Sequence, residues 1–165
     1  MTSNDLLHPT VRAVLEELGV AYEVMACDPA LADTAAFVEA YGVPLDQSAN
    51  TILVASKGAE PIHVACVLLA TTSLDVNNVV RREMGARKAS FARADPVMAL
   101  TGMEIGGVTP FGLPATVPVL VDARVIERPW IVVGGGNRSS KLRVAPVALQ
   151  ALPTVRVIEG LAVVR

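Results

Sequence analysis

The segment Gly106–Pro114 constrains the fold of this chain more than any other part of the sequence. It holds three glycines and two prolines in the order Gly-Gly-Val-Thr-Pro-Phe-Gly-Leu-Pro. Proline fixes φ and removes a backbone donor, while glycine reaches positive φ and lets another group approach the backbone closely. We therefore expect a loop of fixed shape. Two interpretations stay open: a tight connection between strands, or a loop whose bare N–H groups face a ligand.

The pattern on either side of this loop predicts a single α/β (α+β) domain with a mixed sheet. At 165 residues the chain is long enough for one buried core, and the expected strands outnumber the helices without the one-for-one alternation of a doubly wound sheet. Strands are expected at 21–26, 51–55, 62–69, 88–92, 117–121, 131–133, 142–144 and, as the final strand, 155–158. Helices are expected at 10–18, at 34–41 with Asp33 or Thr34 as cap, at 75–84 with Ser73 as cap and Gly85 as stop, at 95–100, and from Pro146.

Composition, the N-terminal residues and the cysteines together predict the cellular compartment of the protein. Apolar residues make up 52% of the chain and the mean hydropathy is +0.49, yet no apolar run approaches the roughly 20 residues of a membrane-spanning helix. The first residues show neither a basic region nor a cleavage pattern, so no signal peptide is predicted. Cys27 and Cys66 lie far apart and form no CxxC pair, which predicts two buried thiols in a reducing compartment. We therefore expect a cytoplasmic protein.

Charge is divided unevenly along the chain. Residues 1–80 carry two of the fourteen lysines and arginines but ten of the sixteen acidic residues, so residues 81–165 are net basic. Clustered basic side chains attract phosphates through their field and through counterion release. The basic half therefore indicates an anionic partner or, alternatively, an ordinary solvated surface. The densest basic groups are Arg81, Arg82, Arg87, Lys88 and Arg93, followed by Arg138, Lys141 and Arg143.

A second glycine cluster, Gly134–Gly136, precedes Asn137-Arg138-Ser139. It lacks the third glycine of a dinucleotide-binding fingerprint, and the chain contains no GxxxxGK[ST] phosphate loop. Three consecutive glycines still let the backbone approach a ligand, and Arg138 with Lys141 could hold a phosphate there. A bulged strand end is the alternative interpretation.

The sequence lacks the motifs of covalent catalysis and of metal binding. It has no GxSxG motif, and its two histidines are His8, near the N-terminus, and His63, within an apolar strand. We interpret His63 as a core or sheet-face residue rather than a general base. No cluster of His, Cys and carboxylates has metal-ligand spacing, so we expect neither a metal nor a cofactor. An enzyme of this sequence would use backbone N–H groups, a few polar side chains and the substrate itself.

The segment from Gly106 to Gly112 closely resembles the Gly-Gly-Val-Ser/Thr-Pro-Phe-Gly loop of the YbaK family, the prolyl-tRNA-synthetase-associated editing domains. The resemblance runs from the first helix to about Leu149 and includes the strand entry at 50–53, the helix start at 74–75 and the segment 94–102. It implies a compact α/β fold with a mixed, barrel-like sheet flanked by helices, and one YbaK-like editing domain over residues 1–165. The family hydrolyses the ester that joins a wrong amino acid to transfer RNA, often alanine or cysteine on tRNA-Pro, and it includes free-standing trans-editing proteins.

The resemblance also implies a mechanism without a protein nucleophile. The loop would enclose the aminoacyl group and preset donors toward a developing oxyanion, each typically worth about 3 kcal/mol, while water, the terminal ribose hydroxyl or a thiol of the bound amino acid attacks. The basic half would hold the acceptor stem by its phosphates. The expected partners are mischarged tRNA, foremost tRNA-Pro, and prolyl-tRNA synthetase. The residues expected in catalysis are Asn50, Gly106, Gly107, Val108, Thr109 and Pro110; in substrate binding, Thr51, Phe111, Gly134, Gly135 and Gly136; and in tRNA-phosphate binding, Arg81, Arg82, Arg87, Lys88, Arg138 and Lys141.

One position departs from the family pattern. Many members carry a functional lysine in a Lys-Thr-Leu motif at the strand entry, where this chain has Asn50-Thr51-Ile52. Asparagine lacks the charge but can hydrogen-bond a ribose hydroxyl or a carbonyl. Asn50 could therefore anchor the same ester, another cation such as Lys141 or Arg138 could enter the site, hydrolysis could be lost, or Asn50 could be a simple turn residue. The expected function is a deacylase, and the missing lysine leaves a non-catalytic aminoacyl-tRNA or tRNA-binding module as the alternative. An unrelated small-molecule enzyme is a third possibility, because a fold does not determine function.

Overall fold

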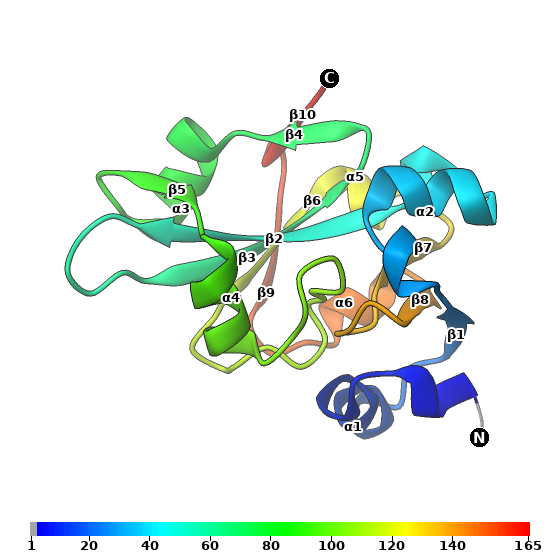
Figure 1. The fold of residues 1–165 in the computed structure, drawn as a ribbon. Coiled ribbons are helices and arrows are strands. Elements are labelled where there is room, and N and C mark those ends of the chain that lie inside the picture. The colour runs from blue at the N-terminus through cyan, green and yellow to red at the C-terminus, as the bar shows by residue number, and fades with distance from the viewer. Residues whose placement is uncertain (1–2) are drawn as a thin grey trace.

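A five-stranded mixed sheet organises residues 3–165, the part of the chain that the computed structural model describes (Figure 1). Its strand order is β5-β2-β3-β6-β9, with bounds Ala89–Phe91, Ala49–Ser56, His63–Leu69, Val119–Asp122 and Val155–Ile158. β2 and β3 form the predicted antiparallel hairpin, and β5 pairs with the other edge of β2. The pairs β3–β6 and β6–β9 are parallel, which makes the sheet mixed as expected.

Two smaller sheets complete the strands. One has the order β1-β8-β7, with bounds Tyr22–Ala26, Ser140–Val144 and Ile131–Gly134, and a single parallel bridge from Ser48 to Val132 connects it to the start of β2. The other pairs β10 (Ala162–Val164) with β4 (Thr72–Leu74). These pairings confirm a mixed α/β domain with flanking helices. Within residues 3–165 no pairing closes a sheet on itself, so the expected barrel-like sheet is an open one.

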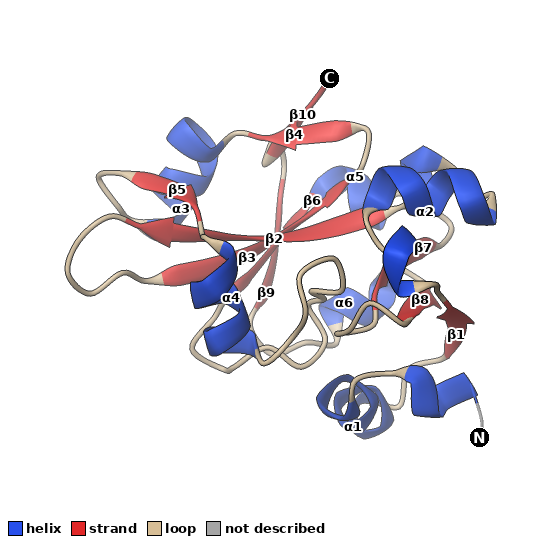
Figure 2. Ribbon diagram, in the orientation of Figure 1, coloured by secondary structure: helices blue, strands red, loops and turns tan. Residues whose placement is uncertain are grey.

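The helices lie around these sheets and are short (Figure 2). The helices α1, α2, α3, α4, α5 and α6 span Pro9–Leu18, Thr34–Tyr41, Arg81–Met84, Ala94–Thr101, Ala123–Ile126 and Val147–Gln150. Short 3-10 turns occupy Ser3–Leu6 (η1), Pro29–Leu31 (η2) and Leu45–Gln47 (η3), and a π-helix occupies Val76–Val80 (η4). Figure 2 shows that the chain between α4 and β6 forms neither helix nor strand, as the glycines and prolines of that segment predict.

The sequence predictions fail where a distant strand is the partner. Ser73 does not cap a helix: it lies in β4, opposite Val163 of β10, and the side chain of Asp75 accepts the capping hydrogen bond from the Asn78 N–H instead (3.2 Å). The strand β9 is also not the final one, because β10 follows it. The partner of residues 72–74 lies about ninety residues away, so no local pattern indicates that they form a strand.

Side chains of the central strands alternate between two core clusters. Leu53, Val67 and Val119 face a large cluster that includes α1 and Phe111 of the glycine-proline loop, while the opposite face contacts a smaller cluster beneath η4 and α3. This alternation follows from the two-residue period of a strand. The loop therefore lies on the large-cluster face of the sheet. Both cysteines are buried free thiols, as predicted.

Candidate functional site

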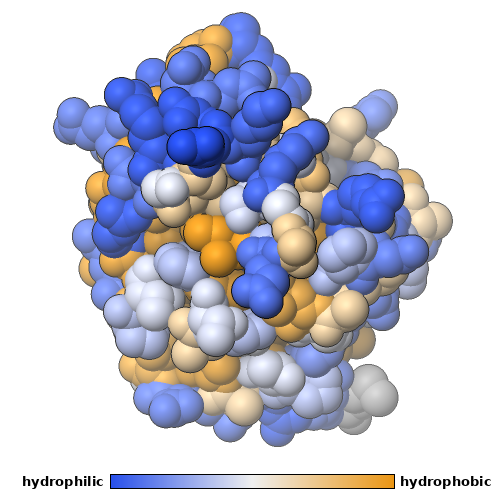
Figure 3. Space-filling view, turned by 90° about the vertical axis from the view of Figure 1, so that its left-hand side faces the viewer, coloured by the Kyte–Doolittle hydropathy of each residue, from blue (hydrophilic) through white to orange (hydrophobic). Residues whose placement is uncertain are grey.

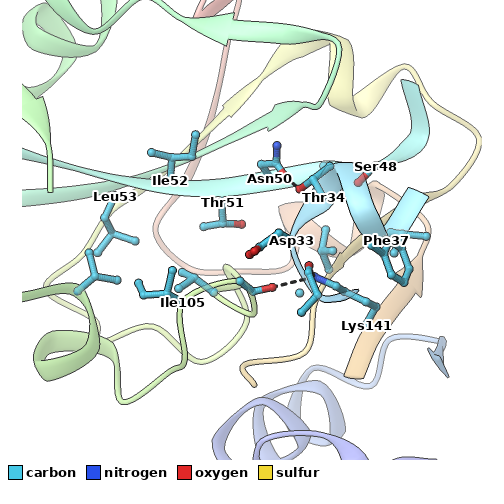
Figure 4. Close-up of a pocket in the computed structure, with 18 of the residues that line it drawn as sticks. Asp33, Thr34, Phe37, Ser48, Asn50, Thr51, Ile52, Leu53, Ile105 and Lys141 are labelled. Carbon is cyan, nitrogen blue, oxygen red and sulfur yellow. Dashed lines mark hydrogen bonds between the residues drawn. The ribbon is translucent and has the colours of Figure 1, made fainter. Parts of the chain in front are cut away.

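A pocket of about 260 Å³ lies between β2, the start of α2 and the loop that follows α4 (Figure 4). Its walls come from residues 32–37, residues 48–53, residues 105–108 and residues 132–134, together with Ala92, Val97 and Lys141. In Figure 4, Ile52, Leu53 and Ile105 lie toward one end, and Ser48, Phe37 and Lys141 lie toward the other. The pocket therefore has an apolar end and an end with a charged side chain, and it joins segments that are far apart in the sequence.

The glycine-proline loop and the glycine cluster at 134–136 pack backbone against backbone. The Gly136 N–H donates to the Gly107 carbonyl at 2.7 Å. A Cβ on Gly107 would lie 2.1 Å from the Asn137 carbonyl oxygen, and a Cβ on Gly134 would lie 2.5 Å from the Gly107 carbonyl oxygen. Backbone atoms cannot turn aside as a side-chain end can. Glycine is therefore required at both positions by close approach, and this contact holds the loop in place as a pocket wall.

Lys141 brings a buried ammonium group into the pocket. It lies on β8, between β1 and β7, and only 7% of the residue is exposed. Its Nζ donates to the carbonyls of Ala32 (2.7 Å) and Gly106 (2.8 Å) and lies 5.3 Å from the centre of the Phe37 ring. Burial lowers the pKa of Lys141 because desolvation disfavours the charged form. The sequence predicts Lys141 as a tRNA-phosphate ligand or as a cation that enters the site, and the structure places it in the pocket wall.

Arg138 connects the same two segments from a more exposed position. Its guanidinium donates to the carbonyls of Pro29 and Ile105, both at 2.9 Å, and forms an ion pair with Asp33 at 3.1 Å. The Arg138 side chain is 27% exposed and that of Asp33 is 73% exposed. Lys141 and Arg138 thus hold the consecutive carbonyls of Gly106 and Ile105, and the loop is fixed by two cations.

Asn50 and Thr51 line the pocket from β2. The Asn50 Oδ1 accepts a 2.6 Å hydrogen bond from the Thr34 hydroxyl, and its side-chain nitrogen has no partner among the described residues. Strand alternation turns Thr51 to the other side of β2, toward Asp33 in Figure 4. The Thr51 hydroxyl is buried without a hydrogen-bond partner in the described chain. Among the described residues, β2 therefore presents the unpaired amide nitrogen of Asn50 on one face and the unpaired hydroxyl of Thr51 on the other.

Two backbone amides of the loop are also free. Gly106 and Val108 line the pocket, and their N–H groups form no hydrogen bond with any described residue. The N–H of Gly107 between them is used, because it donates to the Glu104 carbonyl at 2.9 Å. Buried or half-buried amides are normally paired. The unpaired amides of Gly106 and Val108 can therefore bind an oxygen atom of a ligand.

Other predicted residues of the two glycine segments do not line this pocket. These are Gly107, Thr109, Pro110, Phe111, Gly135 and Gly136. Phe111 is fully buried in the large core cluster and Thr109 is fully buried beside it in the loop. The Gly135 carbonyl accepts from the His8 N–H at 3.1 Å, so the glycine cluster also anchors the start of α1. These residues do not line the pocket, and they can affect it only through their packing behind the lining residues.

The four remaining basic residues predicted to bind tRNA lie elsewhere. Arg81 and Arg82 belong to α3, which packs over the smaller core cluster, and Arg87 and Lys88 are exposed between α3 and β5. The pocket lies on the opposite face of the sheet, so these four are not gathered with Arg138 and Lys141. Figure 3 views the side that carries β5, α3 and α4, where hydrophobic surface appears between hydrophilic regions.

Among the pocket residues that the sequence does not indicate as site residues, four have polar or aromatic side chains: Asp33, Thr34, Phe37 and Ser48. Asp33 and Thr34 were recognised only as a helix start, and they do begin α2. Their place in the pocket follows from how α2 packs beside β2. The one available signal was the helix-start pattern itself, which places polar groups at a fixed point in the chain but does not indicate what they face.

Among residues 3–165, no helix combines the length and apolar character needed to cross a membrane. The same residues contain no group of three or more His, Cys, Asp or Glu side chains arranged to hold a metal ion.

Comparison with known proteins assigns most of the chain to one family. Residues 28–152 match the model of the aminoacyl-tRNA editing domain. A stretch of 111 residues, 67% of this chain, is 28% identical to the uncharacterized protein YwhH of Bacillus subtilis (strain 168) and covers 68% of it.

Two crystal structures share the fold. One, of a protein proposed to be a trans-editing enzyme for prolyl tRNA synthetase, has a TM-score of 0.77 and 23% identity over 93% of this chain and 97% of its own. The other, of a hypothetical protein, has a TM-score of 0.82 and 24% identity over 93% of this chain and 99% of its own. The family match contains β2, the loop and β7–β8, the segments that build the pocket. The chain therefore belongs to the aminoacyl-tRNA editing domain family.

Proposed function

We propose that this protein is a trans-editing deacylase that hydrolyses the ester of mischarged aminoacyl-tRNA, such as Ala- or Cys-tRNA-Pro. The observation that carries the proposal is the pair of unpaired amides, Gly106 and Val108, on a pocket wall held rigidly opposite β2. A family that acts on aminoacyl-tRNA supplies the substrate class. We further propose that residues 1–165 act as one editing domain in the cytoplasm.

The reaction needs no protein nucleophile. The ester carbonyl would lie beside the Gly106 and Val108 amides, and the free amide nitrogen of Asn50 would bind the ribose or the carbonyl. Attack of water on the carbonyl carbon forms a tetrahedral oxyanion as the water releases a proton to the solvent. Collapse of this intermediate breaks the bond to the ribose oxygen, which takes a proton, and releases the amino acid and uncharged tRNA. A preset donor to such an oxyanion typically lowers the activation free energy by about 3 kcal/mol.

We propose that the two ends of the pocket determine where the other parts of the substrate bind. The apolar end, with Leu53 and Ile105, would contact the amino-acid side chain. The acceptor stem would pass round the edge of the five-stranded sheet to reach the exposed Arg82, Arg87 and Lys88, which lie on the face opposite the pocket. Gly107, Thr109, Pro110, Phe111, Gly135 and Gly136 would act by shaping the wall, and prolyl-tRNA synthetase is the proposed partner that produces the mischarged tRNA.

The test is deacylation of Ala-, Cys- and Ser-charged tRNA-Pro by the wild type and by Asn50→Lys. We expect the wild type to release at least one of these amino acids faster than buffer alone. No turnover on any of the three at micromolar protein would contradict the deacylase. A higher rate with Asn50→Lys would show that the position still faces the ester, and a lower rate would show that asparagine has its own role.

A second function is favoured by one contact. The Asn50 Oδ1 is already engaged by Thr34, and asparagine carries no charge, so the β2 side of the pocket is suited to hold an ester without activating it. This arrangement fits a module that binds aminoacyl-tRNA but does not hydrolyse it. Such a module would bind charged tRNA more tightly than uncharged tRNA and leave the ester intact. Enzyme-dependent release of amino acid eliminates this alternative.

A further inference from the structure

We propose that Lys141 is a charged donor of the site, and that its remaining N–H binds the carbonyl oxygen of the aminoacyl ester and the oxyanion that forms there. This inference deepens the proposed function and rests on it. It assigns a chemical role to a side chain on β8, which contributes to the pocket from the side opposite β2.

The hydrogen-bond inventory of the ammonium leaves one donor unused. A lysine ammonium has three N–H donors and no acceptor. Two donors are occupied by the carbonyls of Ala32 and Gly106, at 2.7 and 2.8 Å. No third acceptor exists among the described residues, and Lys141 lines the pocket. The two carbonyls hold the ammonium at a fixed point beside the unpaired Gly106 amide, so the third N–H is preset for a ligand oxygen.

The charge of Lys141 is also incompletely neutralised. Asp33, a carboxylate that raises the pKa of Lys141, is paired with Arg138, and no salt bridge to Lys141 occurs in the described chain. Two carbonyl dipoles and the Phe37 ring are what compensate the buried cation. A buried charge without a counter-ion is costly. A negative charge that develops on the ester oxygen would relieve this cost, so the site favours the transition state over the neutral ester.

The kinetic test compares Lys141→Met and Lys141→Gln with Arg138→Met. We expect both Lys141 variants to lose about 10²–10³-fold in kcat, with a smaller change in KM, because each removes a charged donor to the oxyanion. Arg138→Met is the control for bracing, because it frees the Pro29 and Ile105 carbonyls and the Asp33 carboxylate, as Lys141→Met frees the Ala32 and Gly106 carbonyls. Its kcat loss should be much smaller. Thermal unfolding of each variant establishes that it is folded.

Two results would overturn the proposal. Glutamine can still donate to the carbonyls of Ala32 and Gly106, so recovery of kcat in Lys141→Gln would mean that Lys141 only braces the loop. An equal kcat loss in Arg138→Met would lead to the same conclusion.

The pH profile gives a readout that a bracing role would not change. The groups that face the ammonium are Cys27 at the end of β1, Asp33 and Arg138, besides the Phe37 ring. If protonated Lys141 is required, the enzyme-dependent rate falls as pH rises through its lowered pKa. Lys141→Arg should shift this fall to higher pH, and Cys27→Ser should keep the fall but move it to lower pH, because Cys27 raises the pKa of Lys141. A fall that disappears in Cys27→Ser and does not move in Lys141→Arg would overturn the assignment to Lys141.

A binding assay separates this inference from the proposed function. The probe is an adenosine that carries alanine through a 3′-amide, which cannot be hydrolysed as an ester, and the reference is adenosine itself. Lys141→Met should weaken binding of the acylated probe and not of adenosine, whether or not the wild type deacylates any tRNA. Equal binding of the acylated probe by wild type and variant would refute the carbonyl contact.

Discussion

Replacing Gly107 with alanine tests whether the pocket wall depends on the close approach of two backbones. Gly107 does not have a positive φ, so alanine can adopt its backbone conformation without strain. The difficulty is space, because the new Cβ would lie 2.1 Å from the Asn137 carbonyl oxygen, 2.5 Å from its carbon and 2.7 Å from the Asn137 nitrogen. Ordinary van der Waals contact begins at 3.4 Å. The loop and the segment after Gly134–Gly136 must therefore separate by roughly 1 Å or more.

This displacement sets the expected magnitudes. Overpacking of a buried site typically costs about 1–3 kcal/mol, which in a domain of this size lowers Tm by roughly 2–12 °C. Separation would also weaken the 2.7 Å hydrogen bond from Gly136 to Gly107. A misplacement of about 1 Å in a catalytic wall can cost about 10²-fold in rate. We therefore expect Gly107→Ala to lose both stability and deacylation.

Urea denaturation followed by circular dichroism measures the first loss, and deacylation of the best charged tRNA measures the second. Gly85→Ala is the control, because Gly85 has φ of 69° and nothing within 4 Å of its added Cβ. It should cost about 1–2 kcal/mol through backbone strain alone and leave deacylation unchanged. A Gly107→Ala protein with the stability and activity of the wild type would refute the close-approach account.

Three other predictions follow from the structure. Burial raises the pKa of the Cys66 thiol to about 12, so Cys66 should react with a thiol reagent only after denaturant is added; rapid labelling of the folded protein would contradict its burial. Phe37 is 1% exposed, stacks on Tyr41 and contacts the Lys141 ammonium, so Phe37→Ala should cost about 3–5 kcal/mol in urea denaturation. If Arg82 and Arg87 contact tRNA phosphates, alanine at either position should reduce the salt dependence of tRNA binding by about one unit of slope, and an unchanged slope in filter binding would remove that residue from the interface.

The predictable part of the fold is the part with local causes. Helix α1 begins near Pro9 and ends at Gly19, and α2 follows Asp33 and ends at Gly42, as capping residues and apolar spacing indicate. The hairpin β2–β3 follows from two apolar runs around a turn at 57–60. The pair β4–β10 was not predictable, because residues 72–74 form a strand only where the C-terminal segment pairs with them.

The candidate site likewise has features with local causes and features that only tertiary contacts decide. The sequence by itself determines that residues 106–114 are a loop, because glycine and proline restrict the backbone whatever surrounds them. It also indicates that Asn50 stands at a strand entry. Only the tertiary structure decides that this loop contacts Gly134–Gly136, and that Lys141 is inside the pocket while Arg82 is on the surface. The physical reason is register: a lysine is buried or exposed according to which face of its strand it occupies, and the pairing of β8 with β1 and β7 decides that face.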